Sequence, residues 1–195
     1  MFNLNFTICP IKKFLLLITG IATLFLLALP GTASAASHMR TPINYLKSSE
    51  TIPYPDINKL KDPWIKVSIA KNRVYIMDGH RCVYTMYASA GKYESKHGKR
   101  VSATPTGTFA IQDDRGASFY NAAVKCGANN YVSWHDNGAY LFHSVPTDKD
   151  GHYIKSEAAN LGKQTASHGC IRLSVPDSKW MMNVPTGTKV VVQEN

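Results

Sequence analysis

The sequence is poor in cysteine, has a single long apolar run and shows no internal repeat. It contains four cysteines in 195 residues. No two cysteines have C-x-x-C spacing and no two histidines have H-x-x-x-H spacing, the patterns that make a zinc or redox site a strong prediction. With 44% apolar residues, the chain has enough hydrophobic material for one ordinary domain.

Acidic residues are also scarce. Thirteen Asp and Glu face 22 Lys and Arg, which gives a formal net charge of +9. The basic residues are scattered and form no recognised nucleic-acid-binding motif, so the sequence argues against nucleic acid as a partner. A basic protein outside the cell would instead meet anionic wall polymers or a membrane surface.

The only long apolar run lies near the start of the chain. Lys12 and Lys13 precede the run 14–29, and Pro30 and Gly31 separate it from Ala33-Ser34-Ala35. Its 16 residues are fewer than the roughly 20 that span a bilayer. This layout predicts a secretory signal peptide over residues 1–35, cleaved after Ala35, with a retained anchor as the alternative. The protein is therefore expected to be secreted, extracytoplasmic and associated with the cell wall.

Removal of residues 1–35 would leave an odd number of thiols. Cys9 and two lysines would be lost, which lowers the net charge from +9 to +7 and leaves Cys82, Cys126 and Cys170. Export favours disulfides, but three cysteines leave at least one free thiol. If Cys82 pairs with Cys126, the free thiol is Cys170; the sequence also allows all three to be free.

The rest of the chain divides into a polar segment and a β-rich domain. Residues 36–62 contain several prolines and little periodicity, which predicts a linker or an irregular N-terminal arm. Residues 63–195 are expected to form the folded domain. Alternating apolar positions there predict strands, namely 65–69, 73–77, 82–90, 108–111, 131–134, 140–145 and 189–193.

Only two short helices are predicted. One covers 157–161 and stops at Gly162; the other covers 176–183, with Ser174 as its N-cap. Many short strands with turn signals and so few helices predict a mainly β fold, a β-sandwich or barrel.

One stretch of the domain, Thr-Ala-Ser-His-Gly-Cys-Ile-Arg-Leu-Ser at 165–174, carries candidate chemistry. A nucleophilic cysteine needs a base or a positive neighbour, since only the thiolate attacks. His168 is two residues before Cys170, and His143 stands at the end of a predicted strand. A zinc site made of His143, His168 and Cys170 is a second reading, and a buried structural thiol is a third.

These residues resemble the active-site signature of the L,D-transpeptidases, the YkuD-like family. The resemblance rests on Ser167-His168-Gly169-Cys170-Ile171-Arg172, on Leu141-Phe142-His143-Ser144 upstream, and on Thr104-Pro105-Thr106-Gly107-Thr108-Phe109. It extends from about residue 64 to residue 192. Two features depart from the family pattern: extra residues between His143 and Ser167, and an arginine at 172 where many members have asparagine.

The resemblance implies a role for each residue of the signature. Cys170 would be the nucleophile and His143 the base, with the main-chain carbonyl of Ser144 orienting the imidazole. Ser167, His168 and Gly169 would support the site. Backbone N–H groups around Gly169 and Cys170 would form the oxyanion hole. Arg172 would bind a carboxylate of the substrate or make a structural salt bridge.

The reaction implied is acyl transfer between peptidoglycan stem peptides through a thioester on Cys170, which forms a 3→3 cross-link. It needs no metal and no cofactor. Alternatives are an L,D-carboxypeptidase that uses water at the same site, a sortase-like transpeptidase, and a non-catalytic wall-binding module.

Overall fold

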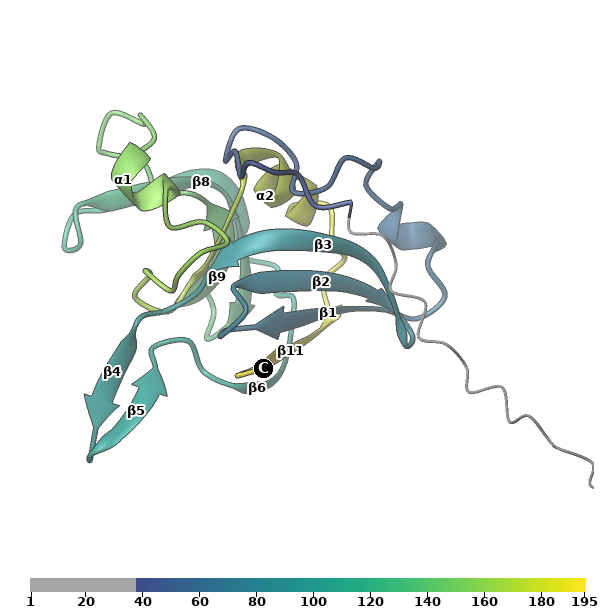
Figure 1. Cartoon of the computed structure of the whole chain (residues 1–195), viewed down its shortest axis with the longest axis horizontal. Coiled ribbons are helices and arrows are strands. Elements are labelled where there is room, and N and C mark those ends of the chain that lie inside the picture. Colours follow the sequence, from purple (N-terminus) through teal and green to yellow (C-terminus); the bar gives the residue numbers. More distant parts are fainter. Residues whose placement is uncertain (1–37) are drawn as a thin grey trace, which may run out of the picture. The chain divides into compact units, whose positions relative to one another are not determined.

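The computed structural model describes residues 38–195, and most of their strands belong to one sheet. Its nine strands lie in the order β6-β11-β1-β2-β3-β10-β9-β8-β7, and β4 and β5 form a separate two-stranded sheet (Figure 1). The strands are β1 Pro63–Ser68, β2 Arg73–Asp78, β3 Arg81–Ser89, β4 Tyr93–Lys96, β5 Lys99–Ser102, β6 Gly107–Ala110, β7 Arg115–Asn121, β8 Cys126–His135, β9 Tyr140–Ser144, β10 Ile171–Leu173 and β11 Lys189–Gln193.

The large sheet curls into a half-barrel around the main core. Strand β6, at one edge, is followed by residues that bond to β8 near the other edge: the amide of Gln112 donates to the carbonyl of Ser133 (2.8 Å). The ring of Phe109 on β6 packs against Trp134 on β8, with centroids 5.0 Å apart. Alternate residues of the central strands fill the enclosed space, and Ile65, for example, is fully buried. Burial of this apolar face is the main force that stabilises the curl.

Three short helices accompany the sheet: η1 Ile57–Lys59, α1 Lys155–Ala158 and α2 Val175–Met181. Helix α2 begins where the sequence predicts, because the side chain of Ser174 accepts a hydrogen bond from the amide of Asp177. Helix α1 begins two residues earlier than expected and is shorter, since the chain turns from Ala159 onward.

Residues 38–62 form an irregular arm that packs on the domain through a buried carboxylate. Asp177 on α2 is fully buried and accepts hydrogen bonds from the hydroxyls of Ser49 (2.5 Å) and Tyr54 (2.6 Å). The backbone amide of Ser49 adds a third bond at 3.2 Å. Burial raises the pKa of Asp177, and these hydrogen bonds oppose that rise. The arm is thereby tied to α2, beside which it runs in Figure 1.

We expect Asp177→Ala to lower the free energy of unfolding by about 2–4 kcal/mol, because it leaves the buried hydroxyl and amide of Ser49 and the half-buried hydroxyl of Tyr54 without their acceptor. Denaturant unfolding of the variant and of the wild type measures this difference. Asp150→Ala is the matched control, since Asp150 is exposed. A loss within about 0.5 kcal/mol of the control would show that the arm is anchored elsewhere.

The predicted mainly β fold with few short helices is confirmed. The predicted strands are present, with ends shifted by a few residues. The sequence missed β4, β5, β7 and β10. The first two lie where a loop was expected, β7 is largely exposed, and β10 has only three residues.

No helix within residues 38–195 is long and apolar enough to cross a membrane. The predicted signal peptide and its cleavage point, with Cys9, lie outside the described residues.

Candidate active site

The sheet places the predicted nucleophile and base at neighbouring strands. Strand β10 begins directly after Cys170 and pairs in parallel with β9, so that Arg172 lies opposite His143. Cys170 and His143 line one open pocket with a volume of about 360 Å³. The pocket is lined by Asp114, Phe119, Asn121, Val124, Cys126, Tyr131, Gly138, Ala139, Leu141, His143, Ser167, His168, Cys170 and Arg172.

Ser167 fixes the tight turn that carries Cys170, the predicted nucleophile. Its hydroxyl donates to the carbonyl of Cys170 (2.6 Å) and accepts from the amide of Gly169 (3.0 Å). Gly169 has φ +143°, and a Cβ there would lie 2.8 Å from the ring of Tyr140. Only glycine fits this position without strain. The buried Thr104 braces the turn from outside, because its hydroxyl donates to the carbonyl of Gly169 (2.8 Å).

This geometry corrects one expectation about the oxyanion hole. The amide of Gly169 already donates to the hydroxyl of Ser167. The sequence predicted donors among the backbone N–H groups around Gly169 and Cys170. The sequence cannot show that the side chain two residues earlier accepts from the amide of Gly169. The amide of Cys170 is left as the candidate donor from the turn.

Cys170 is half-buried, and its thiol is neutral at rest. Its Sγ donates to the carbonyl of Ala139 at 3.7 Å, so its hydrogen bond goes to that carbonyl and not to His143. Burial raises the pKa of the Cys170 thiol; the backbone amide of Leu141 and the charge of Arg172 oppose this rise. To act as a nucleophile, the thiol would need a base that removes its proton.

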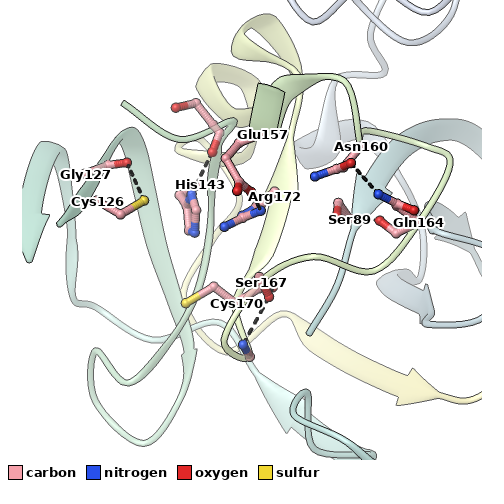
Figure 2. A network of polar contacts seen from close by, with 12 residues as sticks. Ser89, Cys126, Gly127, His143, Glu157, Asn160, Gln164, Ser167, Cys170 and Arg172 are labelled. Carbon is pink, nitrogen blue, oxygen red and sulfur yellow. Dashed lines mark hydrogen bonds and ion pairs between the residues drawn. The ribbon is translucent and has the colours of Figure 1, made fainter. Parts of the chain in front are cut away.

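His143 is held as a neutral imidazole whose second nitrogen is free to accept a proton. Its Nδ1 lies 2.6 Å from the carbonyl of Ser144 (Figure 2). A carbonyl can only accept, so Nδ1 carries the proton and Nε2 has the lone pair. Burial, reinforced by the charge of Arg172 and opposed by the Ser144 bond, lowers the pKa of His143 to about 4. The ring of Phe119 meets it edge-on, with centroids 5.5 Å apart.

His168 and Ser144 have different surroundings from His143. His168 lines the pocket but is exposed. Ser144 is fully buried; its hydroxyl donates to the carbonyl of Val145 (2.8 Å) and accepts from the amide of Asn129 (2.9 Å). Ser144 thus acts on the pocket through its backbone carbonyl.

Arg172 makes the salt bridge that the sequence offered as one of its two roles. Its side chain is 6% exposed and its Nη1 lies 2.5 Å from a carboxylate oxygen of Glu157 on α1 (Figure 2). Its Nε is buried and has no hydrogen-bond partner within residues 38–195. Glu157 lies between His143 and Ser167, the stretch expected to hold extra residues. That segment therefore supplies a counter-charge beside the pocket.

Sequence reasoning missed several pocket residues. Phe119 and Asn121 come from β7, a strand that was not predicted, and Cys126 begins β8. The sequence left open whether Cys126 pairs with Cys82 or all three thiols are free, and the structure has Cys82, Cys126 and Cys170 as free thiols. Its presence in the pocket follows from strand register, for which the sequence held no signal.

The residues proposed for zinc do not form a compact ligand set. Within residues 38–195, the one group of three close ligand atoms is Asp148, Asp150 and His152 on an exposed loop. It includes neither Cys170 nor His143. The pocket is therefore better suited to a thiol and a base than to a metal ion.

The chain resembles L,D-transpeptidases in sequence. A family model described as L,D-transpeptidase catalytic domain (YkuD) matches residues 62–192. The chain is 45% identical over 154 residues to the Bacillus subtilis (strain 168) protein named "Putative L,D-transpeptidase YciB", which covers 78% of this chain and 76% of that protein.

Solved structures agree at the level of the fold. An L,D-transpeptidase from Mycobacterium tuberculosis H37Rv is 25% identical, with a TM-score of 0.51, over 68% of this chain and 58% of that one. The LD transpeptidase LdtMt1 in complex with imipenem is 20% identical, with the same TM-score of 0.51, over 68% and 59%. This chain thus spans less than two thirds of their length. Because the family model covers most of the domain and the B. subtilis relative is so similar, the chain belongs to the L,D-transpeptidase (YkuD) family.

Proposed function

We propose that the protein is an exported cysteine L,D-transpeptidase that forms 3→3 cross-links between peptidoglycan stem peptides. The observation that carries the proposal is the pocket in which Cys170 and a neutral, oriented His143 lie together. The family acts on such stem peptides. The family match also favours this function over a sortase.

The first half of the reaction acylates the enzyme. His143 Nε2 takes the thiol proton as Cys170 Sγ attacks the carbonyl that joins the third stem residue to the terminal D-Ala. The C–N bond breaks, His143 returns the proton to the leaving amine, and D-Ala departs. The amide of Cys170 would stabilise the developing oxyanion, a contribution of about 3 kcal/mol for one donor.

The second half transfers the acyl group to another stem. The side-chain amine of its third residue attacks the thioester, His143 accepts the amine proton, and the same proton restores the Cys170 thiol. Water in place of the amine would make the enzyme an L,D-carboxypeptidase. An open pocket allows either acceptor.

Mass spectrometry of muropeptides tests the proposed activity. Cells that express the protein should contain 3→3 cross-linked dimers. Cells that express Cys170→Ala at the same level should lack the dimers that the wild-type protein forms. Tripeptides without dimers would assign the carboxypeptidase activity. No difference from the Cys170→Ala cells would reject both.

Arg172 is expected to set the pH range of the base. Its positive charge lowers the pKa of His143, so Arg172→Gln should raise that pKa. A base with a higher pKa is protonated, and therefore inactive, up to a higher pH; the acid limb of the acylation rate should move toward higher pH. Arg172→Lys keeps the charge and should stay near the wild-type limb. An unmoved limb in Arg172→Gln would contradict this electrostatic role.

A further inference from the structure

The hairpin of β4 and β5 stands apart from the nine-stranded sheet and pairs only with itself. It projects from the body of the domain at the lower left of Figure 1. All residues from 94 to 101 are exposed. Only Tyr93, at the base of the hairpin, packs against the main core. A two-stranded hairpin is only marginally stable in water by itself, and core packing does not explain the sequence of residues 94–101.

The hairpin carries an excess of positive charge. Residues 92–102 hold four basic side chains and one acidic one, Glu94. Lys96 pairs with Glu94 at 3.6 Å, but both side chains are more than half exposed, so the pair contributes little. Within residues 38–195, Lys92, Lys99 and Arg100 have no acidic partner.

The strand register places two of the four basic side chains of the hairpin against each other. Lys96 lies directly opposite Lys99 across the turn of His97 and Gly98, whose φ angles are +51° and +74°. Like charges at opposed positions destabilise a hairpin. An anion bound at the tip would remove this repulsion.

The face of the hairpin that carries Tyr93 and Arg100 borders a second cavity. The guanidinium of Arg100 stacks on the ring of Tyr93, 3.7 Å from its centroid, and the hydroxyl of Tyr93 bonds to Glu194. The cavity has a volume of about 520 Å³ and is lined by Lys92, Tyr93, Arg100, Glu157, Asn160, Gln164, Thr165 and Ala166. Its one carboxylate, that of Glu157, is already paired with Arg172. The cations and amides remain as donors to an anion.

The base of the hairpin is joined to the turn that carries the nucleophile. The amide of Lys92 donates to the carbonyl of Ser167 (2.9 Å). The hydroxyl of Thr104, just beyond β5, accepts from the amide of Gly91 (2.7 Å) and donates to the carbonyl of Gly169. A polymer held on the hairpin would therefore lie next to the catalytic pocket.

We propose that the hairpin and the second cavity bind a phosphodiester polymer of the cell wall and dock the enzyme on it. A membrane surface is a poorer partner, because interfacial segments carry Trp, Phe or Leu anchors and Val101 is the only large exposed hydrophobic residue on the hairpin. This surface adds to the proposed acyl transfer and shares with it only the location outside the cytoplasm.

Binding of soluble poly(glycerol phosphate) to the protein tests the proposal. The triple variant Lys96→Gln, Lys99→Gln and Arg100→Gln removes three charges from the hairpin. Lys47→Gln, Lys71→Gln and Lys179→Gln remove the same number from exposed positions elsewhere. The hairpin variant should bind the polymer at least about tenfold more weakly than the wild type. The slope of log K against log salt concentration should fall by about one for each lost contact. The control triple should stay within about threefold of wild type.

Two results would overturn the docking surface. Equal weakening of both triples would mean that only the net charge matters, and tighter binding to phosphatidylglycerol vesicles than to the polymer would assign a membrane. The rate of Cys170 acylation by a small β-lactam should be unchanged in the hairpin triple. Loss of polymer binding with normal acylation separates this surface from the catalytic proposal.

Discussion

Incubation with a carbapenem should add one adduct to the wild-type protein, and Cys170→Ala should give none. A carbapenem contains a strained amide carbonyl that an activated thiol can attack, which would leave the opened lactam bound to the sulfur as a thioester. Cys170 is the thiol that follows the Ser-His-Gly turn, and its pocket also contains His143, the proposed base. Intact-mass spectrometry counts the adducts directly.

The other free thiols provide the matched controls. Cys126 lines the same pocket, whereas Cys82 is exposed on another strand. Burial raises the pKa of Cys126, and its sulfur donates to the carbonyl of its neighbour Gly127 (3.6 Å). Cys126→Ala and Cys82→Ala should therefore each keep one adduct. An adduct that survives in Cys170→Ala and disappears in Cys126→Ala would move the nucleophile to Cys126.

The parts of the fold that follow simple periodicity could be predicted from the sequence. In β1, β2 and β11, one face is buried in the core, so apolar residues alternate with polar ones. In β4, β5 and β7, almost no residue is buried, and no alternation is imposed. Strand β10 is buried at all three positions and is too short to show a period.

The candidate site divides in the same way. Cys170 and His143 were identified from short motifs whose residues are close in sequence. Strand pairing brings Cys126 and Phe119 beside them, and the segment between His143 and Ser167 brings Glu157. Local sequence patterns predict neither the strand pairing nor the path of that segment. The bond from the amide of Gly169 to Ser167 is a matter of turn geometry. It changed the predicted oxyanion hole although every residue involved had been identified.

His143→Ala should slow acylation of Cys170 by about 10² to 10⁴-fold, the usual contribution of a general base. The reason is the state of the pair at neutral pH. The pKa of the Cys170 thiol is raised and that of His143 is lowered to about 4, so neither group is charged and attack requires proton transfer. The wild-type rate should fall only on the acid side, near pH 4, because the imidazolium cannot accept a proton.

His168→Ala is the matched control, since His168 stands in the same pocket, nearer in sequence to Cys170. His143 is buried and its ring is oriented by the carbonyl of Ser144, whereas His168 is exposed to solvent. Its replacement should therefore cost much less than that of His143 and leave the acid limb in place. The melting temperature of each variant is measured first and should equal that of the wild type, so that a folding defect is not mistaken for lost catalysis. A folded, inactive His168→Ala beside a His143→Ala that acylates within about tenfold of wild type would exchange the two roles.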